Sequence, residues 1–301
     1  MTGRMLRGRR FIRILPRIYR HRDHVMTDDD WVLAARLALP SRAHLTGITR
    51  IQQLGLDFGP RFPVRFVVEG DLHLAFDEIF LHRTKRLPPT DGEGVIPAAA
   101  FISFCGRARV IDAIKVGDWL LYHGHMTVGE LHDLALAEQW RDGADQALWV
   151  LDHLDGDARS LPESETRAIV EFAGLPVPEV NRRLPIEDSI VIGDLVLLEW
   201  RVVVEYEGSH HQADRGQYVS DISRYAVMRR HDFGYVQVTK EKLARARSVA
   251  REVHRELVSR GYDGPPPEFG DRWRTLFTRL HRVIGCERLG RRAGGEDGTA
   301  S

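Results

Sequence analysis

The chain has 301 residues, of which 43% are hydrophobic and 29% charged, a composition that excludes a disordered protein and suffices for two domains. Lys+Arg (43) and Asp+Glu (43) balance, so the net charge indicates neither a nucleic-acid nor a membrane partner, and any basic surface must be local. Cys105 and Cys286 form no CxxC pair, which argues against a zinc ribbon or a disulfide scaffold. The sequence shows neither a signal-peptide pattern nor an apolar stretch of about 18 residues, so we expect a cytoplasmic protein.

The first half, residues 1–155, predicts a helix-rich α+β domain. Basic and apolar residues alternate from Arg9 to Tyr19, as in an exposed strand whose arginines either contact phosphates or keep an edge strand soluble. Thr27 precedes an acidic helix start, and Pro40 ends that helix. Further helices are predicted over 41–56, from 97, from 110, from 127 and over 144–154, with a strand over 62–68 and either a strand or a short helix over 74–82.

The second half predicts an α/β layer domain over residues 156–262, after a polar hinge at 155–160. Ser160 and Glu163 have capping-box spacing at the start of a helix that ends at Gly174. The elements expected next are strands at 179–184, 190–197 and 201–207, a helix at 217–231, a strand at 235–238, and helices around 243 and over 249–257. Residues 263–301 predict an appended helix over 273–284 and a disordered tail from 294.

Acidic residues stand on the apolar strand of this second domain. The run from Val202 to Val204 is typical of a buried strand, and Glu205 and Glu207 then share one face because side chains alternate along a strand. Asp194 precedes Glu205 by 205 − 194 = 11 positions. Clustered buried carboxylates are costly to ionise without a cation, so this pattern indicates a site for a hard divalent metal.

The spacing of Asp194 and Glu205 resembles the signature of the PD-(D/E)XK nuclease superfamily. Residues 160–261 resemble the uncharacterised endonuclease-like domains related to the very-short-patch-repair endonuclease, and the preceding region resembles that of AbiEi-type antitoxin proteins. The resemblance implies a restriction-endonuclease-like mixed sheet flanked by helices. The residues that carry it are Glu163, Ser164, Arg167, Gly174, Leu175, Pro176, Asn181, Asp194, Glu205, Tyr206, Glu207, Gly208, His211, Asp214, Arg215, Tyr218, Asp221 and Arg224.

The resemblance implies a metal-dependent endonuclease that hydrolyses DNA. Asp194 and Glu205 are expected to hold Mg²⁺ or Mn²⁺, Glu207 to add a ligand or position water, and Glu163 to reach the metal through water. The position of the family lysine is occupied by Glu207. Glu163 is equally well explained as a helix cap.

The residues after the third strand complete the expected site. His211, or its neighbour His210, is expected to accept a proton near neutral pH. Arg215 and Arg224 are expected to pair with phosphate, and His210 and Tyr218 to contact nucleic acid. A structural ion pair of Arg224 with a nearby acid and a packing role for Tyr218 are the alternatives.

Two non-enzymatic hypotheses follow from the missing lysine and the antitoxin-like first half. One is an inactive nuclease fold that binds DNA or a partner toxin as a regulator, and its binding should weaken with salt. The other is a degenerate fold that serves as a structural interaction module.

Overall fold

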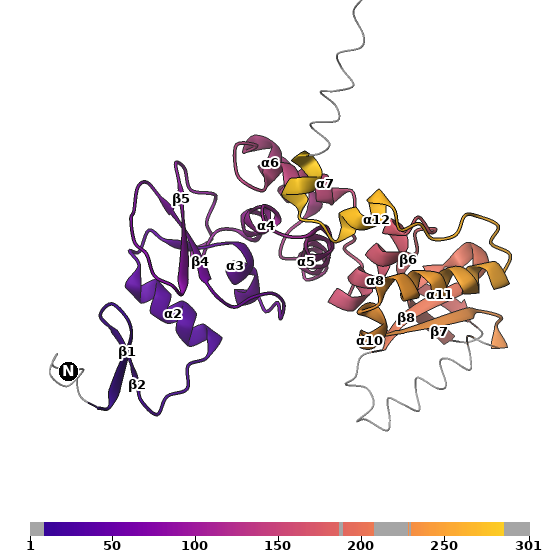
Figure 1. Cartoon of the computed structure of the whole chain (residues 1–301), viewed down its shortest axis with the longest axis horizontal. Coiled ribbons are helices and arrows are strands. Elements are labelled where there is room, and N and C mark those ends of the chain that lie inside the picture. The colour runs from indigo at the N-terminus through magenta and orange to yellow at the C-terminus, as the bar shows by residue number, and fades with distance from the viewer. Residues whose placement is uncertain (1–8, 187–188, 208–227, 229, 286–301) are drawn as a thin grey trace, which may run out of the picture. The chain divides into compact units, whose positions relative to one another are not determined.

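The computed structural model describes residues 9–186, 189–207, 228 and 230–285 (Figure 1). Contacts divide the chain into two compact units, Met1–Phe104 and Cys105–Ser301, and each is considered by itself. The expected boundary at 155–156 lies inside the second unit. Both units combine helices with strands, which confirms the α/β class.

The first unit begins with an antiparallel hairpin of β1 (Phe11–Leu15) and β2 (Ile18–His21). The single strand expected over 9–19 is therefore wrong in part, because the chain turns at Arg17, whose φ of 66° lies in the left-handed region. Helix α2 (Asp28–Ala38) follows. The acidic start expected after Thr27 is confirmed, and Thr27 caps the helix: its hydroxyl accepts the N–H of Asp30, and the Asp30 carboxylate accepts the N–H of Thr27.

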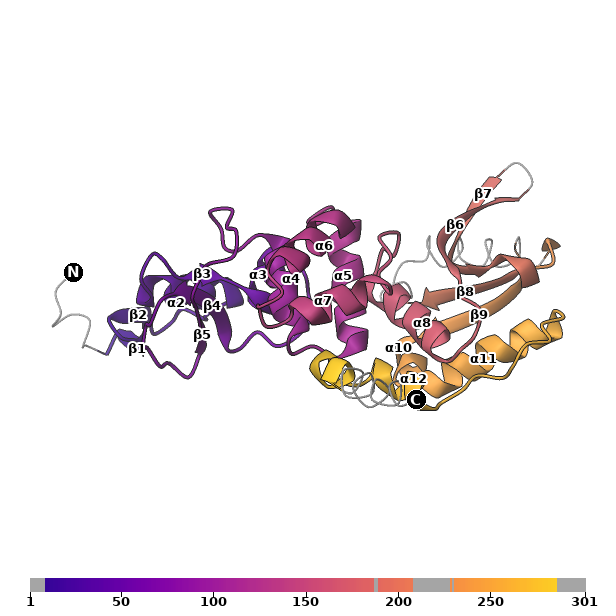
Figure 2. The same cartoon turned by 90° about the horizontal axis from the view of Figure 1, so that it is seen from above.

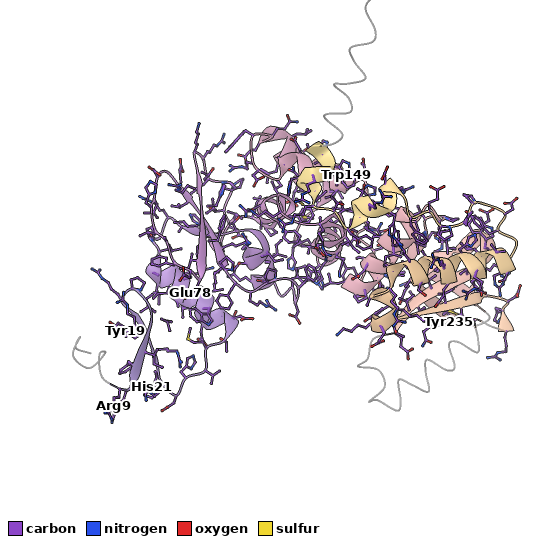
Figure 3. The ribbon with its side chains drawn as sticks, in the orientation of Figure 1. Arg9, Tyr19, His21, Glu78, Trp149 and Tyr235 are labelled. Atoms are coloured by element: carbon purple, nitrogen blue, oxygen red, sulfur yellow. The ribbon has the colours of Figure 1, made fainter. Side chains whose placement is uncertain are left out.

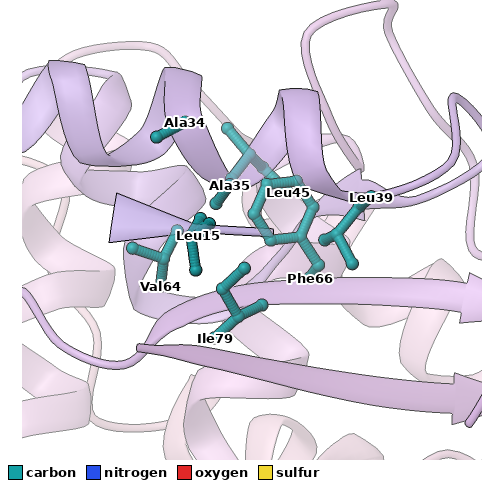
Figure 4. Close-up of a cluster of buried hydrophobic side chains, with 8 residues drawn as sticks. All are labelled: Leu15, Ala34, Ala35, Leu39, Leu45, Val64, Phe66 and Ile79. Carbon is teal, nitrogen blue, oxygen red and sulfur yellow. The ribbon is translucent and has the colours of Figure 1, made fainter. Parts of the chain in front are cut away.

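A three-stranded sheet forms the centre of this unit, with β3 (His44–Leu45) antiparallel to β4 (Val64–Glu69) and β4 parallel to β5 (Ile79–Thr84). Helix α3 (Gly47–Gln53) is shorter than the helix expected over 41–56, because β3 occupies the start of that segment. The ambiguous segment 74–82 ends in a strand, β5. The core side chains, shown in Figure 4, are Leu15, Ala34, Ala35, Leu39, Leu45, Val64, Phe66 and Ile79.

Four helices lead into the second sheet: α4 (Pro97–Cys105), α5 (Val110–Tyr122), α6 (Val128–Ala137) and α7 (Ala144–Leu151). Their predicted starts are confirmed within one residue. Thr127 and Glu130, four positions apart counting both ends, form a capping box at the start of α6.

The second unit carries a four-stranded sheet in the order β6 (Glu179–Ile186), β7 (Ser189–Leu197), β8 (Val202–Glu207) and β9 (Gly234–Thr239). The β6–β7 and β7–β8 pairs are antiparallel, and β8 pairs with β9 in parallel. Helices α8 (Leu161–Phe172), α10 (Lys240–Leu243) and α11 (Ala246–Ser259) pack with this sheet. Figure 2 shows the β6–β7 hairpin extending beyond β8 and β9.

A buried ion pair joins α5 to α8. Arg167 donates to the carboxylate of Asp118 and to the main-chain carbonyl of His153, both at 2.8 Å. The other carboxylate oxygen of Asp118 accepts the N–H of Asp155 at 2.7 Å. The expected hinge at 155–160 is thereby tied to α5, in keeping with the place of α5, α6 and α7 in the same compact unit as this sheet.

The helix expected over 273–284 is interrupted. Helix α12 (Asp271–Leu276) ends before Phe277, Arg279 forms an isolated bridge with Arg109, and a helical turn resumes at Leu280. The bridge draws this segment against the start of α5, so the single-helix expectation is wrong. The tail expected from 294 and most of the helix expected over 217–231 lie outside the described residues.

The Asp118 carboxyl gives a pH-dependent prediction. Burial raises its pKa to about 6 from 3.8, although Arg167 and the N–H of Asp155 oppose the rise. The unfolded chain therefore loses this proton first, so the stability contributed by Asp118 is complete below its unfolded pKa and is lost as the pH rises to about 6. As the pH rises from 3.8 to about 6, the free energy of unfolding of the wild type should fall by up to about 3 kcal/mol relative to that of Asp118→Asn.

Urea unfolding of both proteins at a series of pH values measures this difference. Asp133→Asn, at an exposed carboxylate of α6, controls for the chemical change. A stability difference between wild type and Asp118→Asn that stays constant with pH would contradict the prediction.

Candidate functional site

The pairing of β7 with β8 places Asp194 beside Glu205. Their antiparallel pairing runs from Leu197↔Val202 to Leu195↔Val204, and Asp194 and Glu205 are the next residues on each strand. The Asp194 carboxylate accepts the main-chain N–H of Tyr206 at 3.0 Å. Asp194 is therefore held beside the peptide that follows Glu205, a placement in keeping with the 11-residue spacing seen in the sequence, 205 − 194.

Glu205 is a buried acid in the middle of the mixed sheet, with 4% of its surface exposed. The hydroxyl of Tyr235 on β9 donates to Glu205 Oε2 at 3.0 Å (Figure 3 labels Tyr235). In the parallel register, Tyr235 pairs with Val203, two residues before Glu205 on the same strand face. Tyr235 thus supplies a hydrogen bond that a buried carboxylate requires.

Glu207 ends β8, half-buried and opposite Thr239. It shares the face of Glu205 by the strand alternation, whereas Tyr206 between them faces the other way. Burial, with the negative charges of Glu241 and Glu165, raises the pKa of Tyr206 above its ordinary value, so its phenol stays neutral. The main-chain N–H of Tyr206 is the group that serves Asp194.

Glu163 is committed to protein hydrogen bonds at both carboxylate oxygens. Oε1 accepts the hydroxyl of Ser160 at 2.8 Å, and Oε2 accepts the N–H of Arg159 at 3.0 Å and the side-chain amide of Asn181 at 2.8 Å. Ser160 in turn accepts the N–H of Glu163 at 3.3 Å. The helix-cap interpretation therefore has direct support, and Glu163 additionally braces β6.

Asn181 connects this helix cap to the strand that carries Asp194. It lies between the pairs Val180↔Leu195 and Arg182↔Gly193, at the level of Asp194. Its φ of 47° breaks the regular ladder there, which turns its amide toward Glu163 and the carbonyl of Asp157. Asparagine tolerates this left-handed conformation better than most residues.

The remaining expected site residues follow β8 in the sequence. His210, His211, Arg215, Tyr218 and Arg224 all lie outside the described residues. Sequence reasoning did not single out Tyr235 as a partner of Glu205, since the parallel β8–β9 register that joins them has no local signal. Asp118, the partner of Arg167, was missed as well, because a contact between two helices far apart in the sequence also leaves no local signal.

Across the described part of the chain, no three His, Cys, Asp or Glu side chains gather closely enough to hold a metal ion. Asp194, Glu205 and Glu207 thus make no three-residue metal cluster by themselves. They contribute carboxylate oxygens, which are the ligands that Mg²⁺ and Mn²⁺ prefer.

Comparisons with protein-family models, with curated proteins and with solved structures found no match for this chain. Among the described residues, no helix has both the length and the apolar character needed to cross a membrane. The assignment of chemistry therefore depends on the site geometry.

The bonding of Glu163 predicts a stability effect. Glu163→Gln replaces one acceptor oxygen with an NH₂ donor that faces other donors, so the free energy of unfolding should fall by about 1–2 kcal/mol. Glu179→Gln, in an exposed ion pair with Arg182 on β6, should change it by less than about 0.5 kcal/mol. Chemical denaturation measures both, and a Glu163→Gln protein as stable as wild type would show that the cap contributes nothing.

Proposed function

We propose that this protein is a metal-dependent endonuclease-like enzyme that hydrolyses phosphodiester bonds of DNA. The observation that carries the proposal is the hydrogen bond from the Tyr206 N–H to Asp194, which holds this carboxylate next to buried Glu205 across two central strands. Two carboxylates held side by side, of which Glu205 is buried and Asp194 half-buried, repel each other, and a divalent cation bound between them relieves that repulsion. The sequence resemblance to endonuclease-like domains supports the same chemistry.

The donor set fits a hard divalent ion. Asp194 and Glu205 would hold it, with Glu207 as a further ligand or a water-positioning group. Mg²⁺ is commonly bound by one or two protein carboxylates together with water and substrate phosphates, so a three-residue cluster is not required. When bound, Mg²⁺ or Mn²⁺ polarises a phosphate and lowers the pKa of a coordinated water.

The protein's own groups orient the two carboxylates. The Tyr206 N–H fixes one oxygen of Asp194, and the Tyr235 hydroxyl fixes one oxygen of Glu205. Such outer hydrogen bonds set the direction of carboxylate ligands and tune their affinity for a metal. His211 or His210 for proton transfer, and Arg215 and Arg224 for phosphate, complete the proposed arrangement from the segment after β8.

A second candidate is a catalytically inactive nuclease fold that regulates by binding DNA or a partner toxin. Two observations favour it. Glu207 occupies the position of the family lysine, and the oxygens of Glu163 already serve the α8 cap and Asn181. A third possibility, an interaction module, requires neither metal nor DNA.

The nuclease proposal predicts that the purified chain nicks supercoiled plasmid with Mg²⁺ or Mn²⁺ and stops in EDTA. Glu205→Gln keeps an acceptor for Tyr235 but loses the charge that binds a cation, so the nicking rate should fall on the order of 100-fold or more. Asp194→Asn should behave alike, and Glu179→Gln on β6 should nick like wild type. Gel densitometry of the nicked and linear products gives the rates.

The outcomes separate the candidates. Activity that survives both acid substitutions comes from a contaminant and overturns the proposal. Wild type as inactive as the variants also overturns it, and DNA binding retained in all of these proteins then selects the regulator. Absence of metal binding by calorimetry, together with absence of DNA binding, selects the interaction module.

A further inference from the structure

Helix α11 presents a stripe of arginines on its exposed side. Arg247, Arg251 and Arg255 follow one another at intervals of four residues, so they lie along one face of the helix, and all three are exposed. Within the described residues, none of them forms an ion pair with a carboxylate. Arg260, just beyond the same helix, instead pairs with Glu256 at 3.3 Å and with Asp232 at 3.4 Å.

Two of these arginines contact the first of three aromatic rings, Phe269, Trp273 and Phe277, that pack one against the next. The guanidinium groups of Arg247 and Arg251 each lie 5.3 Å from the ring centre of Phe269. Phe269 contacts Trp273 edge to face with ring centres 4.9 Å apart, and Trp273 contacts Phe277 at 5.2 Å. Stacking on one ring restricts both guanidinium groups, which lowers the entropy lost when they bind a ligand.

A hollow of about 500 Å³ opens beside this stripe. Its walls include Arg245, Arg247, Arg251, Ser248, Trp273 and Phe277, and no Asp or Glu is among the described residues that line it. The first turn of α11 likewise contains no acid, and Arg245 at its N-cap forms no side-chain capping bond. The charged side chains that are described in its wall, Arg245, Arg247 and Arg251, are therefore all basic.

This arrangement is electrostatically unfavourable in the protein alone. Like charges four residues apart on a helix repel, and cations at a helix N-terminus oppose the helix dipole. A bound anion would relieve both effects. Eight helical residues rise about 12 Å, so the stripe spans roughly the axial length of three to four nucleotides of one DNA strand, at about 3.4 Å each.

We propose that the arginine stripe of α11, comprising Arg247, Arg251 and Arg255 with the adjoining hollow, binds the phosphodiester backbone of nucleic acid. Guanidinium groups match phosphate oxygens in a bidentate geometry. A lipid surface fits less well, because Trp273 is buried at 4% exposure and Phe269 lies half-buried against the arginines. Of the three rings only Phe277, at 37% exposure, is presented to the surface, which is little apolar area for insertion. This binding does not require the hydrolysis proposed for Asp194 and Glu205.

The test measures fluorescence anisotropy of a labelled oligonucleotide, single-stranded and duplex, with the full chain in EDTA over a salt series. A triple variant, Arg247→Gln with Arg251→Gln and Arg255→Gln, should bind at least about tenfold more weakly at moderate salt. Its slope of log affinity against log salt should be shallower by about 2 to 3, because three phosphate contacts are lost. Arg→Lys at the same positions should restore most of the slope.

A matched triple variant controls for net charge. Arg36→Gln, Arg61→Gln and Arg83→Gln remove three charges from arginines that are paired with carboxylates in the first unit. Circular dichroism verifies that both triple variants are folded. The control should bind as wild type does.

Each other outcome overturns the inference. The stripe variant could bind the oligonucleotide with the affinity and salt slope of the wild type, or the control variant could lose as much affinity as the stripe variant does. The wild type could also bind no oligonucleotide, or bind phosphatidylserine vesicles and not the oligonucleotide. The nuclease proposal fails separately: a protein that binds DNA through the stripe but never nicks plasmid refutes hydrolysis alone. A protein that nicks plasmid while the stripe variant keeps wild-type affinity refutes the stripe alone.

Discussion

The buried pair of Arg167 and Asp118 is the interaction on which the second unit depends. Arg167 has its guanidinium within 2.8 Å of the Asp118 carboxylate and is also 3.5 Å from Glu171, while His153 bonds to Glu171 at 2.8 Å. Two buried charges are tolerated only when each has several partners, and here α5, α8 and the segment just after α7 provide them. This network fixes α8 against α5 and against the segment that follows α7.

Helix α8 then determines the geometry beside Asp194. Its first turn carries Glu163, which holds the side chain of Asn181, and Asn181 interrupts the β6–β7 ladder at the level of Asp194. On the other side, the N–H of Tyr206 holds Asp194. The main chain of β8 thus holds the Asp194 carboxylate, beside the point at which Asn181 interrupts the β6–β7 ladder. Hydrogen bonds of this kind set the direction of a carboxylate.

Local patterns predicted most of the secondary structure but not the long-range pairings. Thr127 and Glu130 could be recognised as a capping box because the signal lies within four residues, and Val202 to Val204 as a strand because β-branched runs favour one. The hairpin at Arg17 and the break before Arg279 were missed, since a left-handed residue and a bridge to Arg109 leave no periodic signature. The Tyr235–Glu205 contact depends on a parallel register that only the folded chain defines.

The even balance of 43 basic and 43 acidic residues conceals a local segregation of charge. The acids of the central strands accept hydrogen bonds from neighbouring strands, as Glu205 does from Tyr235. The arginines of α11 stand exposed and stack on Phe269. Because surface charges farther apart than about 10 Å are largely screened at ordinary ionic strength, such a stripe acts on a nearby polyanion regardless of the net charge. A neutral composition therefore does not argue against a nucleic-acid partner once the cations are concentrated on one helix face.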